Sequence, residues 1–171
     1  MTERTKIKID RLTWSEYACY LAIAAESRSE DPRTKVGCCI LNRHGRVLST
    51  GYNGLKTGME IELWMLNVEN RKRKAKLFIH AESNALNLVS YEDEPHLLGC
   101  TWSPCASCAQ RIASTSIQKV YFINDYSQDQ EYIDIFNFYK IKFEKLSETN
   151  LNRIKQRFEQ SFVKIKSLRW P

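Results

Sequence analysis

Short apolar runs alternate with segments of helical periodicity along this chain, and this alternation constrains its fold more than any other feature. The runs VGCCIL and RVLSTGY flank the turn signal NRHG, which is typical of a β-hairpin. Further strands are expected at LGCTWS, KVYFIN and IKFEKL. Strands and helices in this order predict a three-layer α/β/α sandwich with a central mixed sheet of about five strands. Helical patterns cover residues 14–27, 59–70, 78–89, 104–114, 129–139 and 151–166.

The size and composition fit one soluble domain. The chain has 171 residues, of which 43% are hydrophobic and 27% are charged, as in an ordinary globular protein with a single core. No apolar run approaches the roughly 20 residues of a membrane span. The charged start MTERTKIKID lacks the apolar centre of a signal peptide. We therefore expect one cytoplasmic domain over residues 1–171, with a C-terminal helix from about residue 150 and no membrane partner.

The charge of the chain favours an anionic partner. A net charge of +6 suits a nucleotide, a nucleic acid or another phosphate without choosing among them. The densest basic run is RKRKAK, residues 71–76. Such a run is typical of a solvated helix face or loop, and a phosphate-attracting patch is the sharper alternative. In a cytosolic protein, the 6 cysteines are expected to be thiols or metal ligands rather than disulfides.

Two cysteines follow a proline in the segment TWSPCASCAQ. Cys105 and Cys108 are three residues apart, which places both sulfurs on one side of a first helical turn, where the helix N-terminus favours thiolates. Three interpretations stay open for this pair alone. Trp102 before C-x-x-C at a strand-to-helix turn is similar to a thioredoxin dithiol. The pair also fits two zinc ligands, or two buried small apolar side chains.

A third ligand is available in the segment LFIHAESNAL. A histidine beside a glutamate is ordinarily a partly exposed helix surface, but His80 also lies where a helix is expected to begin. With the two cysteines it makes the three protein ligands of a catalytic zinc site, which keeps one position for water. No fourth ligand is expected. His44 falls in the hairpin turn, His96 in a polar loop, and Cys38 and Cys39 on opposite faces of a strand.

Glu82 has a role if His80 holds a metal. Residues two apart on a helix do not share a face, so Glu82 is not expected to be a ligand from the same turn. Its carboxylate can instead lean over the open position, accept a proton from water and pass it on. Zinc lowers the pKa of a bound water toward about 7, so this arrangement suits a hydrolytic deamination.

These residues carry a resemblance to a known family. His80-Ala81-Glu82, followed by PCASC at residues 104–108, resembles the H-x-E…P-C-x-x-C signature of the zinc-dependent nucleotide deaminases. DPRTKVGCCILN is similar to the first strand of that family. STGYNG and HAESNAL resemble the substrate loop and the H-A-E-x-N-A-I motif of its deoxycytidylate branch. The resemblance covers about residues 14–146 and implies a cytidine deaminase-like fold.

The resemblance implies an activity and a set of site residues. The reaction would convert dCMP and water to dUMP and ammonia. Glu82 would carry the protons, and one Zn²⁺ would be held by His80, Cys105 and Cys108. The implied substrate contacts are Asn53 at the sugar, the Ala81 backbone and the Ser103 carbonyl at the pyrimidine edge, and Val36 in the pocket wall; Arg33, Lys35 and Lys56 are candidates for the phosphate.

The deoxycytidylate branch further implies a homohexamer that dCTP with Mg²⁺ activates and dTTP inhibits, with Asn53 and Gly54 near the effector. Two departures bear on this expectation. The segment between the substrate loop and His80 holds no cysteine or histidine for a second zinc, so one zinc is expected. The segment LNLVSYEDEP holds no arginine, whereas some relatives place one there near the nucleotide.

Three alternatives remain from the sequence. A deaminase of dCTP, or of a base in tRNA or another nucleic acid, would keep the zinc site, although TGYNG and HAESNA favour a free mononucleotide over nucleic acid. A thioredoxin-like redox protein would use Cys105 and Cys108 but leaves His80 and Glu82 unexplained. A binding module that keeps the fold without activity is the third, and the presence of Glu82 speaks against it.

Overall fold

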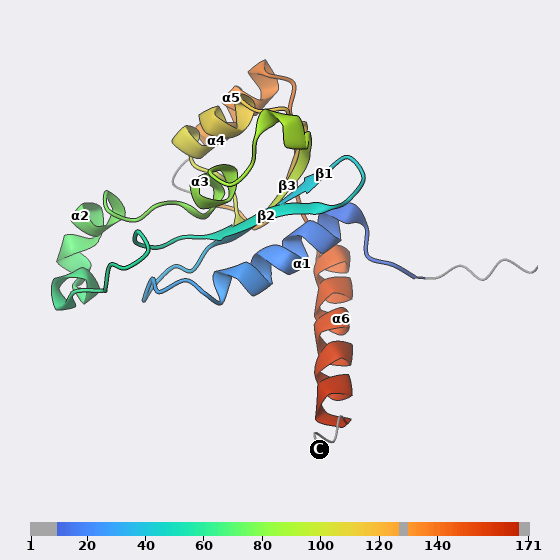
Figure 1. Ribbon diagram of the computed structural model, residues 1–171, viewed down its shortest axis with the longest axis horizontal. Coiled ribbons are helices and arrows are strands. Elements are labelled where there is room, and N and C mark those ends of the chain that lie inside the picture. Colours follow the sequence, from blue (N-terminus) through green and yellow to red (C-terminus); the bar gives the residue numbers. More distant parts are fainter. Residues whose placement is uncertain (1–9, 127–129, 168–171) are drawn as a thin grey trace, which may run out of the picture.

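One five-stranded mixed sheet forms the centre of the molecule, with strand order β2-β1-β3-β4-β5. The computed structural model in Figure 1 describes residues 10–126 and 130–167, with side chains as far as residue 163. β1 pairs antiparallel with β2 and β3, whereas β3, β4 and β5 run parallel. The predicted sheet is therefore confirmed. The strands are β1 (Gly37–Asn42), β2 (Val47–Tyr52), β3 (Pro95–Trp102), β4 (Lys119–Asn124) and β5 (Lys142–Lys145).

Helices cover both faces of this sheet, as Figure 1 shows. On one face, α1 (Trp14–Glu26) packs against β1 and β3, and α6 (Glu148–Ser167) packs against α1. On the other face, α3 (Ala81–Leu86) packs on β1 and β2, while α4 (Ala106–Ala113) and α5 (Glu131–Phe138) lie against each other. These are the three layers that the alternation of strands and helices predicts.

The layer of α1 lies unusually close to the sheet, because small residues face each other there. A Cβ atom on Gly37 would come within 1.9 Å of the Ala22 carbonyl oxygen, and one on Gly99 within 2.7 Å of the Ala18 Cβ. Neither strand position therefore admits a side chain. Close contact of this kind favours alanine on the helix and glycine on the strand.

The buried cysteines of β1 point to opposite faces of the sheet, as the alternation of a strand requires. Cys39 packs in the core under α1, with Ala18, Ala22 and Leu41. Cys38 packs in the larger core on the other face, with residues of α3, α4 and α5. The expectation that both cannot serve one site is confirmed.

The helix predicted over residues 59–70 is wrong. That segment holds two short 3-10 helices, η1 (Leu63–Leu66) and η2 (Val68–Asn70), separated by an extended Asn67 whose side chain accepts a hydrogen bond from the Glu69 amide. Of the apolar residues at helical spacing, Met65 is buried but Val68 is 62% exposed. Periodicity failed here because no sheet face lies opposite the segment to bury an apolar stripe.

Three further boundaries differ from prediction near the site. The helix expected from Phe78 begins only at Ala81, because Ile79 is extended and pairs with Gly54 through two backbone hydrogen bonds of 2.8 and 3.1 Å. His96 was expected in a loop, but β3 already begins at Pro95. Pro104 likewise precedes α4 rather than opening it, because Cys105 is the N-cap.

The C-terminal helix is present as α6. Its buried Ile154 and the ring of Phe158, which stacks on Tyr20 with centroids 4.1 Å apart, face α1. The apolar residues Leu151, Ile154, Phe158 and Ile165 are spaced for one helical face, and of these Ile165 lies beyond the described side chains. The charged start at residues 1–9 and the predicted start of the fifth helix at residue 129 also lie outside the described residues. Within the described part, we find no helix with the length and apolarity that a membrane crossing needs.

Candidate active site and metal centre

The N-termini of two helices bring the three predicted ligands together. His80 is the N-cap residue of α3 and Cys105 that of α4, and both have extended backbones. The His80 Nδ1 atom lies 3.4 Å from the sulfur of Cys105 and 3.4 Å from the sulfur of Cys108. All three ligand atoms lie within 4.8 Å of one another. The segments that precede the helices therefore set the ligand positions.

The cluster fits a zinc ion by donor type and by spacing. Zinc binds sulfur at about 2.3 Å and nitrogen at about 2.0 Å, so ligands of a tetrahedral ion lie roughly 3.5 to 4 Å apart. None of the described cysteines is in a disulfide. Among the described residues, this is the one group of three or more potential ligands that lie close enough for a metal. Three protein ligands leave a coordination position for water, as in catalytic zinc sites.

The three ligands of the cluster differ in how readily they lose a proton, and Cys105 is the most acidic of them. The hydrogen bond from Cys108 lowers the pKa of Cys105 to about 3, outweighing burial, and hydrogen bonds from His80 and Ser107 add to the effect. The pKa of Cys108 is raised because its proton makes that bond and because it is buried. The hydrogen bond with Cys105 also raises the pKa of His80. Hydrogen bonding within the cluster thus favours the thiolate form of Cys105, which is the form that binds a metal.

Glu82 is a buried carboxyl beside the cluster and not a member of it. Only 4% of the residue is exposed. Burial raises the pKa of Glu82, and hydrogen bonds from its own backbone amide and from the Cys108 thiol, together with the charge of His80, offset only part of this rise. A buried carboxyl next to a metal position can take up a proton and return it to a bound substrate.

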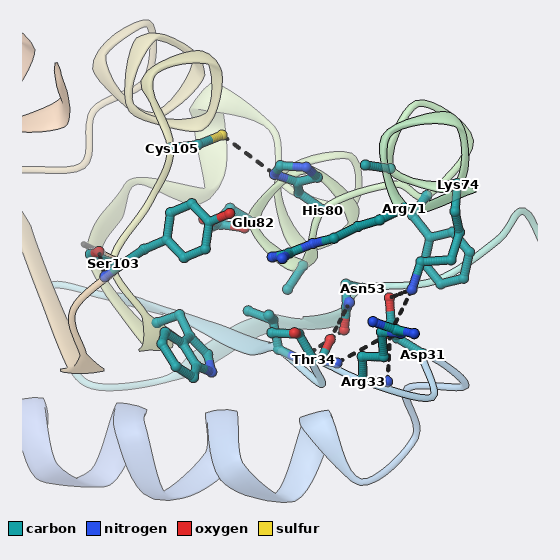
Figure 2. Close-up of a pocket in the computed structure, with 16 residues that line it drawn as sticks. Asp31, Arg33, Thr34, Asn53, Arg71, Lys74, His80, Glu82, Ser103 and Cys105 are labelled. Atoms are coloured by element: carbon teal, nitrogen blue, oxygen red, sulfur yellow. Dashed lines mark hydrogen bonds and ion pairs between the residues drawn. The ribbon is translucent and has the colours of Figure 1, made fainter. Parts of the chain in front are cut away.

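A cavity of about 560 Å³ opens beside Glu82 and is of the size expected for a small-molecule site. Figure 2 shows His80 and Cys105 at one end, Arg33 and Lys74 beside Asp31 at the other, and Arg71 extending between them. All four predicted substrate positions line the cavity, whereas Gly54 does not. The lining residues are Asp31, Arg33, Thr34, Val36, Asn53, Arg71, Lys74, Ala75, Phe78, His80, Ala81, Glu82, Trp102, Ser103, Cys105 and Tyr126.

Asn53 holds the floor of the cavity together. Its Oδ1 atom accepts hydrogen bonds from the Ser29 hydroxyl and the Val36 amide, both at 2.7 Å, and its Nδ2 donates to the Thr34 carbonyl at 2.8 Å. One Nδ2 hydrogen is left for a ligand. The next residue, Gly54, pairs with Ile79 directly before His80. The loop therefore links the cavity floor to a metal ligand.

Ser103 uses its hydroxyl to fix the opposite wall. The hydroxyl donates to Asp125 at 3.0 Å and accepts from the Tyr126 amide at 2.7 Å. This arrangement places Tyr126 on the cavity wall, a position that the sequence analysis missed. The signal was available, because Tyr126 is the second residue after β4, and residues after the carboxyl ends of parallel strands gather at binding crevices.

The cationic end differs from the one predicted. Arg33 lines the cavity, but Lys35 and Lys56 do not, and the Lys35 ammonium donates instead to the Ser29 carbonyl. Two members of the basic run take their place. These are Arg71 and Lys74 on α2 (Arg71–Ala75), so this run is not simply a solvated helix face.

Comparison with known proteins decides the family. Residues 12–124 match the family described as the cytidine and deoxycytidylate deaminase zinc-binding region. Over 133 residues the chain is 33% identical to deoxycytidylate deaminase of Mus musculus, covering 74% of this chain and 73% of that protein. The chain belongs to the cytidine and deoxycytidylate deaminases. The resemblance of its motifs to this deaminase family is thereby confirmed, and the thioredoxin-like interpretation of Cys105 and Cys108 is wrong.

Other members of the deaminase family agree in sequence and fold. Deoxycytidylate deaminase of Homo sapiens is 32% identical over 133 residues, with 74% of this chain and 73% of that protein covered. The apo crystal structure of dCMP deaminase from the cyanophage S-TIM5 superposes with a TM-score of 0.61 at 27% identity, covering 77% of this chain and 96% of that one. The cytidine deaminase-like fold of this chain is confirmed.

Proposed function

We propose that this chain catalyses the hydrolytic deamination of dCMP to dUMP and ammonia. One observation carries the proposal: His80, Cys105 and Cys108 meet beside the buried Glu82, on the wall of a cavity whose other end is cationic. The relatives support the same substrate. The S-TIM5 enzyme, 27% identical with a TM-score of 0.56, is described in complex with dCMP and dUMP, and its structure covers 78% of this chain and 93% of its own.

In this proposal, His80, Cys105 and Cys108 hold one Zn²⁺, which when bound would lower the pKa of a water ligand toward about 7. Glu82 accepts a proton from the attacking water at a carboxylate oxygen. It delivers that proton to N3 of the pyrimidine, then takes the second proton from the hydroxyl formed at C4 and passes it to the departing amine. The water oxygen forms a bond to C4, and the bond from C4 to the amino nitrogen breaks, which releases ammonia.

The remaining cavity residues orient the substrate. The Ala81 amide and the Ser103 carbonyl read the pyrimidine edge, as the wall beside Glu82 allows. Asn53 offers its remaining Nδ2 hydrogen to the sugar, and Val36, whose amide Asn53 holds at 2.7 Å, packs against the nucleoside. This order runs from the metal end to the cationic end, where the 5′-phosphate of a nucleotide would lie.

The test is turnover by protein loaded with one zinc per chain. Incubation with dCMP should yield equal amounts of dUMP, measured by chromatography, and ammonia, measured enzymatically. Parallel reactions with dCTP and with a tRNA anticodon stem-loop measure the alternatives. Deamination of either in preference to dCMP, or no dUMP from fully loaded protein, would overturn the proposal.

We further infer that the chain forms a homohexamer that dCTP with Mg²⁺ activates and dTTP inhibits. Similarity to deoxycytidylate deaminases supports this, and so does the loop at Asn53 and Gly54, because it connects the cavity floor to the residue before His80. An effector that shifts this loop would alter the metal end of the cavity. Light scattering gives the oligomer mass, and dCMP titrations with each triphosphate give the response. A smaller oligomer, or kinetics that neither triphosphate changes, would refute this inference.

A further inference from the structure

The cationic end of the cavity has a charge that matches a phosphate monoester. Figure 2 shows Arg71 reaching from α2 across the cavity toward Glu82, with Arg33 and Lys74 beside Asp31 at the far side. Three cationic side chains and one carboxylate, Asp31, extend into the cavity from this side, so two of the three positive charges have no carboxylate partner on this side. A phosphate monoester carries about −1.5 to −2 charges at pH 7. An uncharged nucleoside would leave both charges without a partner.

The two uncompensated charges belong to the arginines, because Lys74 forms a buried ion pair. The Lys74 ammonium contacts both carboxylate oxygens of Asp31, at 2.9 and 2.8 Å, and the two side chains are 6% and 8% exposed. Lys74 is thus already neutralised. Within the described residues, the Arg71 guanidinium has no hydrogen-bond or ion-pair partner. The Arg33 guanidinium makes, among the same residues, only a 3.4 Å hydrogen bond to the Leu66 carbonyl.

The same ion pair connects the two segments that carry the arginines. Asp31 Oδ1 also accepts hydrogen bonds from the backbone amides of Arg33 and Thr34, at 2.9 and 3.1 Å, and so fixes the turn that presents Arg33. Lys74 lies one helical turn after Arg71 on α2. One buried contact therefore holds together the two backbone segments from which Arg33 and Arg71 extend.

We propose that Arg71, provided in cis by α2, is the specificity-determining residue for a 5′-phosphorylated substrate, and that the Lys74–Asp31 pair positions it opposite Arg33. This inference rests on the proposed deamination and names the part of the chain that recognises the phosphate. A guanidinium can donate two parallel hydrogen bonds to a phosphate, which gives it direction as well as charge.

The test measures the ratio of kcat/KM for dCMP to kcat/KM for deoxycytidine, with zinc-loaded protein and no triphosphate present. Arg71→Ala should lower this ratio about 10- to 100-fold, as expected for the loss of a charged hydrogen bond. Arg71→Lys should recover part of it, because it keeps the charge but loses the paired donors. Lys72→Ala is the matched control, because Lys72 is exposed on the same helix and outside the cavity lining.

Several outcomes would overturn the inference. An unchanged ratio in Arg71→Ala, or an equal fall in Lys72→Ala, would show that the charge of α2 acts only over long range. A change confined to activation by dCTP would assign Arg71 to an effector instead of the substrate.

The wild-type protein offers a further check. Raising the salt concentration should reduce its ratio of kcat/KM for dCMP to kcat/KM for deoxycytidine, since salt screens exposed charges.

A binding measurement separates this inference from the proposed function. If zinc-loaded wild-type protein deaminates neither compound, the proposed function fails, but calorimetry with dCMP and deoxycytidine still tests phosphate recognition. Wild-type protein should bind dCMP more tightly, and Arg71→Ala should remove most of the difference. Equal affinities of the wild-type protein for both compounds would refute the inference.

The positioning role needs a variant that leaves no buried charge. Replacing the pair together, as Asp31→Asn with Lys74→Met, removes both charges and keeps an acceptor for the Arg33 amide. We expect a higher KM for dCMP, a smaller change in kcat, an unchanged zinc content and a lower dCMP preference. A fall in kcat for dCMP and deoxycytidine alike, with KM unchanged, would indicate a general structural role and contradict positioning.

Discussion

At the scale of the residue, the proposed chemistry depends on the carboxyl of Glu82. Glu82→Gln keeps the size and the burial of the side chain but cannot take up a proton. We expect zinc to be retained and kcat for dCMP to fall about 10²- to 10⁴-fold, the range for general acid–base catalysis. Elemental analysis and steady-state kinetics on one preparation test this. Full activity in that variant would remove Glu82 as the proton carrier.

A second residue-scale prediction concerns Cys105, whose sulfur lies 3.4 Å from His80 Nδ1. Cys105→Ala removes the sulfur with the most thiolate character, so both zinc content and dCMP turnover should be lost. Cys39→Ala is the matched control, because that cysteine is buried on the opposite face of the sheet. One zinc per chain in Cys105→Ala would refute the ligand assignment.

At the scale of the element, Glu16 joins two helices. Its carboxylate accepts hydrogen bonds from the Thr13 amide at 2.7 Å, from Asn150 at 2.9 Å and from Arg153 at 2.9 Å. It thus caps α1 and holds the first turns of α6. We expect Glu16→Ala to lower the free energy of unfolding by about 1 to 3 kcal/mol, from the lost cap and the lost charged hydrogen bonds.

The contact also has a pH dependence with a defined sign. Burial raises the pKa of Glu16, but hydrogen bonds from Asn150 and Thr13, with the charge of Arg153, outweigh it and leave that pKa below its ordinary value. A carboxyl whose pKa is lower in the folded than in the unfolded protein stabilises the fold at pH values above its unfolded-state pKa. This contribution is lost as the pH falls through the folded-state pKa. Urea titrations should show that the free energy of unfolding falls less between about pH 6 and pH 3 for Glu16→Gln than for the wild-type protein. An equal dependence of the free energy of unfolding on pH in both proteins would contradict this role of Glu16.

Helices and strands could be predicted from the sequence where their apolar residues pack on the core. The apolar, alanine-rich α1 and the hairpin of β1 and β2 are correct because one face of each packs on the core. The segment 59–70 has similar spacing, but only Met65 of its apolar residues at helical spacing is buried and Val68 is exposed, so no continuous apolar face packs on the core and only short 3-10 helices form. His96 was misplaced because a preceding proline is usual before a loop but also allowed at the start of a strand.

At the scale of the whole molecule, the site divides into parts that the sequence could and could not predict. The metal ligands were found because H-x-E and P-C-x-x-C are local patterns with fixed spacing. The cationic end was not, because it depends on a contact between Asp31 and Lys74, which lie 43 residues apart. Nothing in a basic run of six residues indicates which member is buried and which one reaches the cavity.

The metal should also hold the molecule together, because its ligands come from the starts of α3 and α4, two separate helices on one face of the sheet. A ligand at 100 times its Kd adds about 2.7 kcal/mol to the free energy of unfolding. For a chain of this length, 1 kcal/mol corresponds to about 2 to 4 °C in Tm, so removal of zinc should lower Tm by roughly 5 to 10 °C. Calorimetry before and after chelation measures the shift, and added zinc should restore it. Cys105→Ala should melt at one temperature with or without chelator. If chelation leaves the wild-type Tm unchanged while removing the zinc, the metal does not tie the two helices, and its part in the molecule is confined to the cavity.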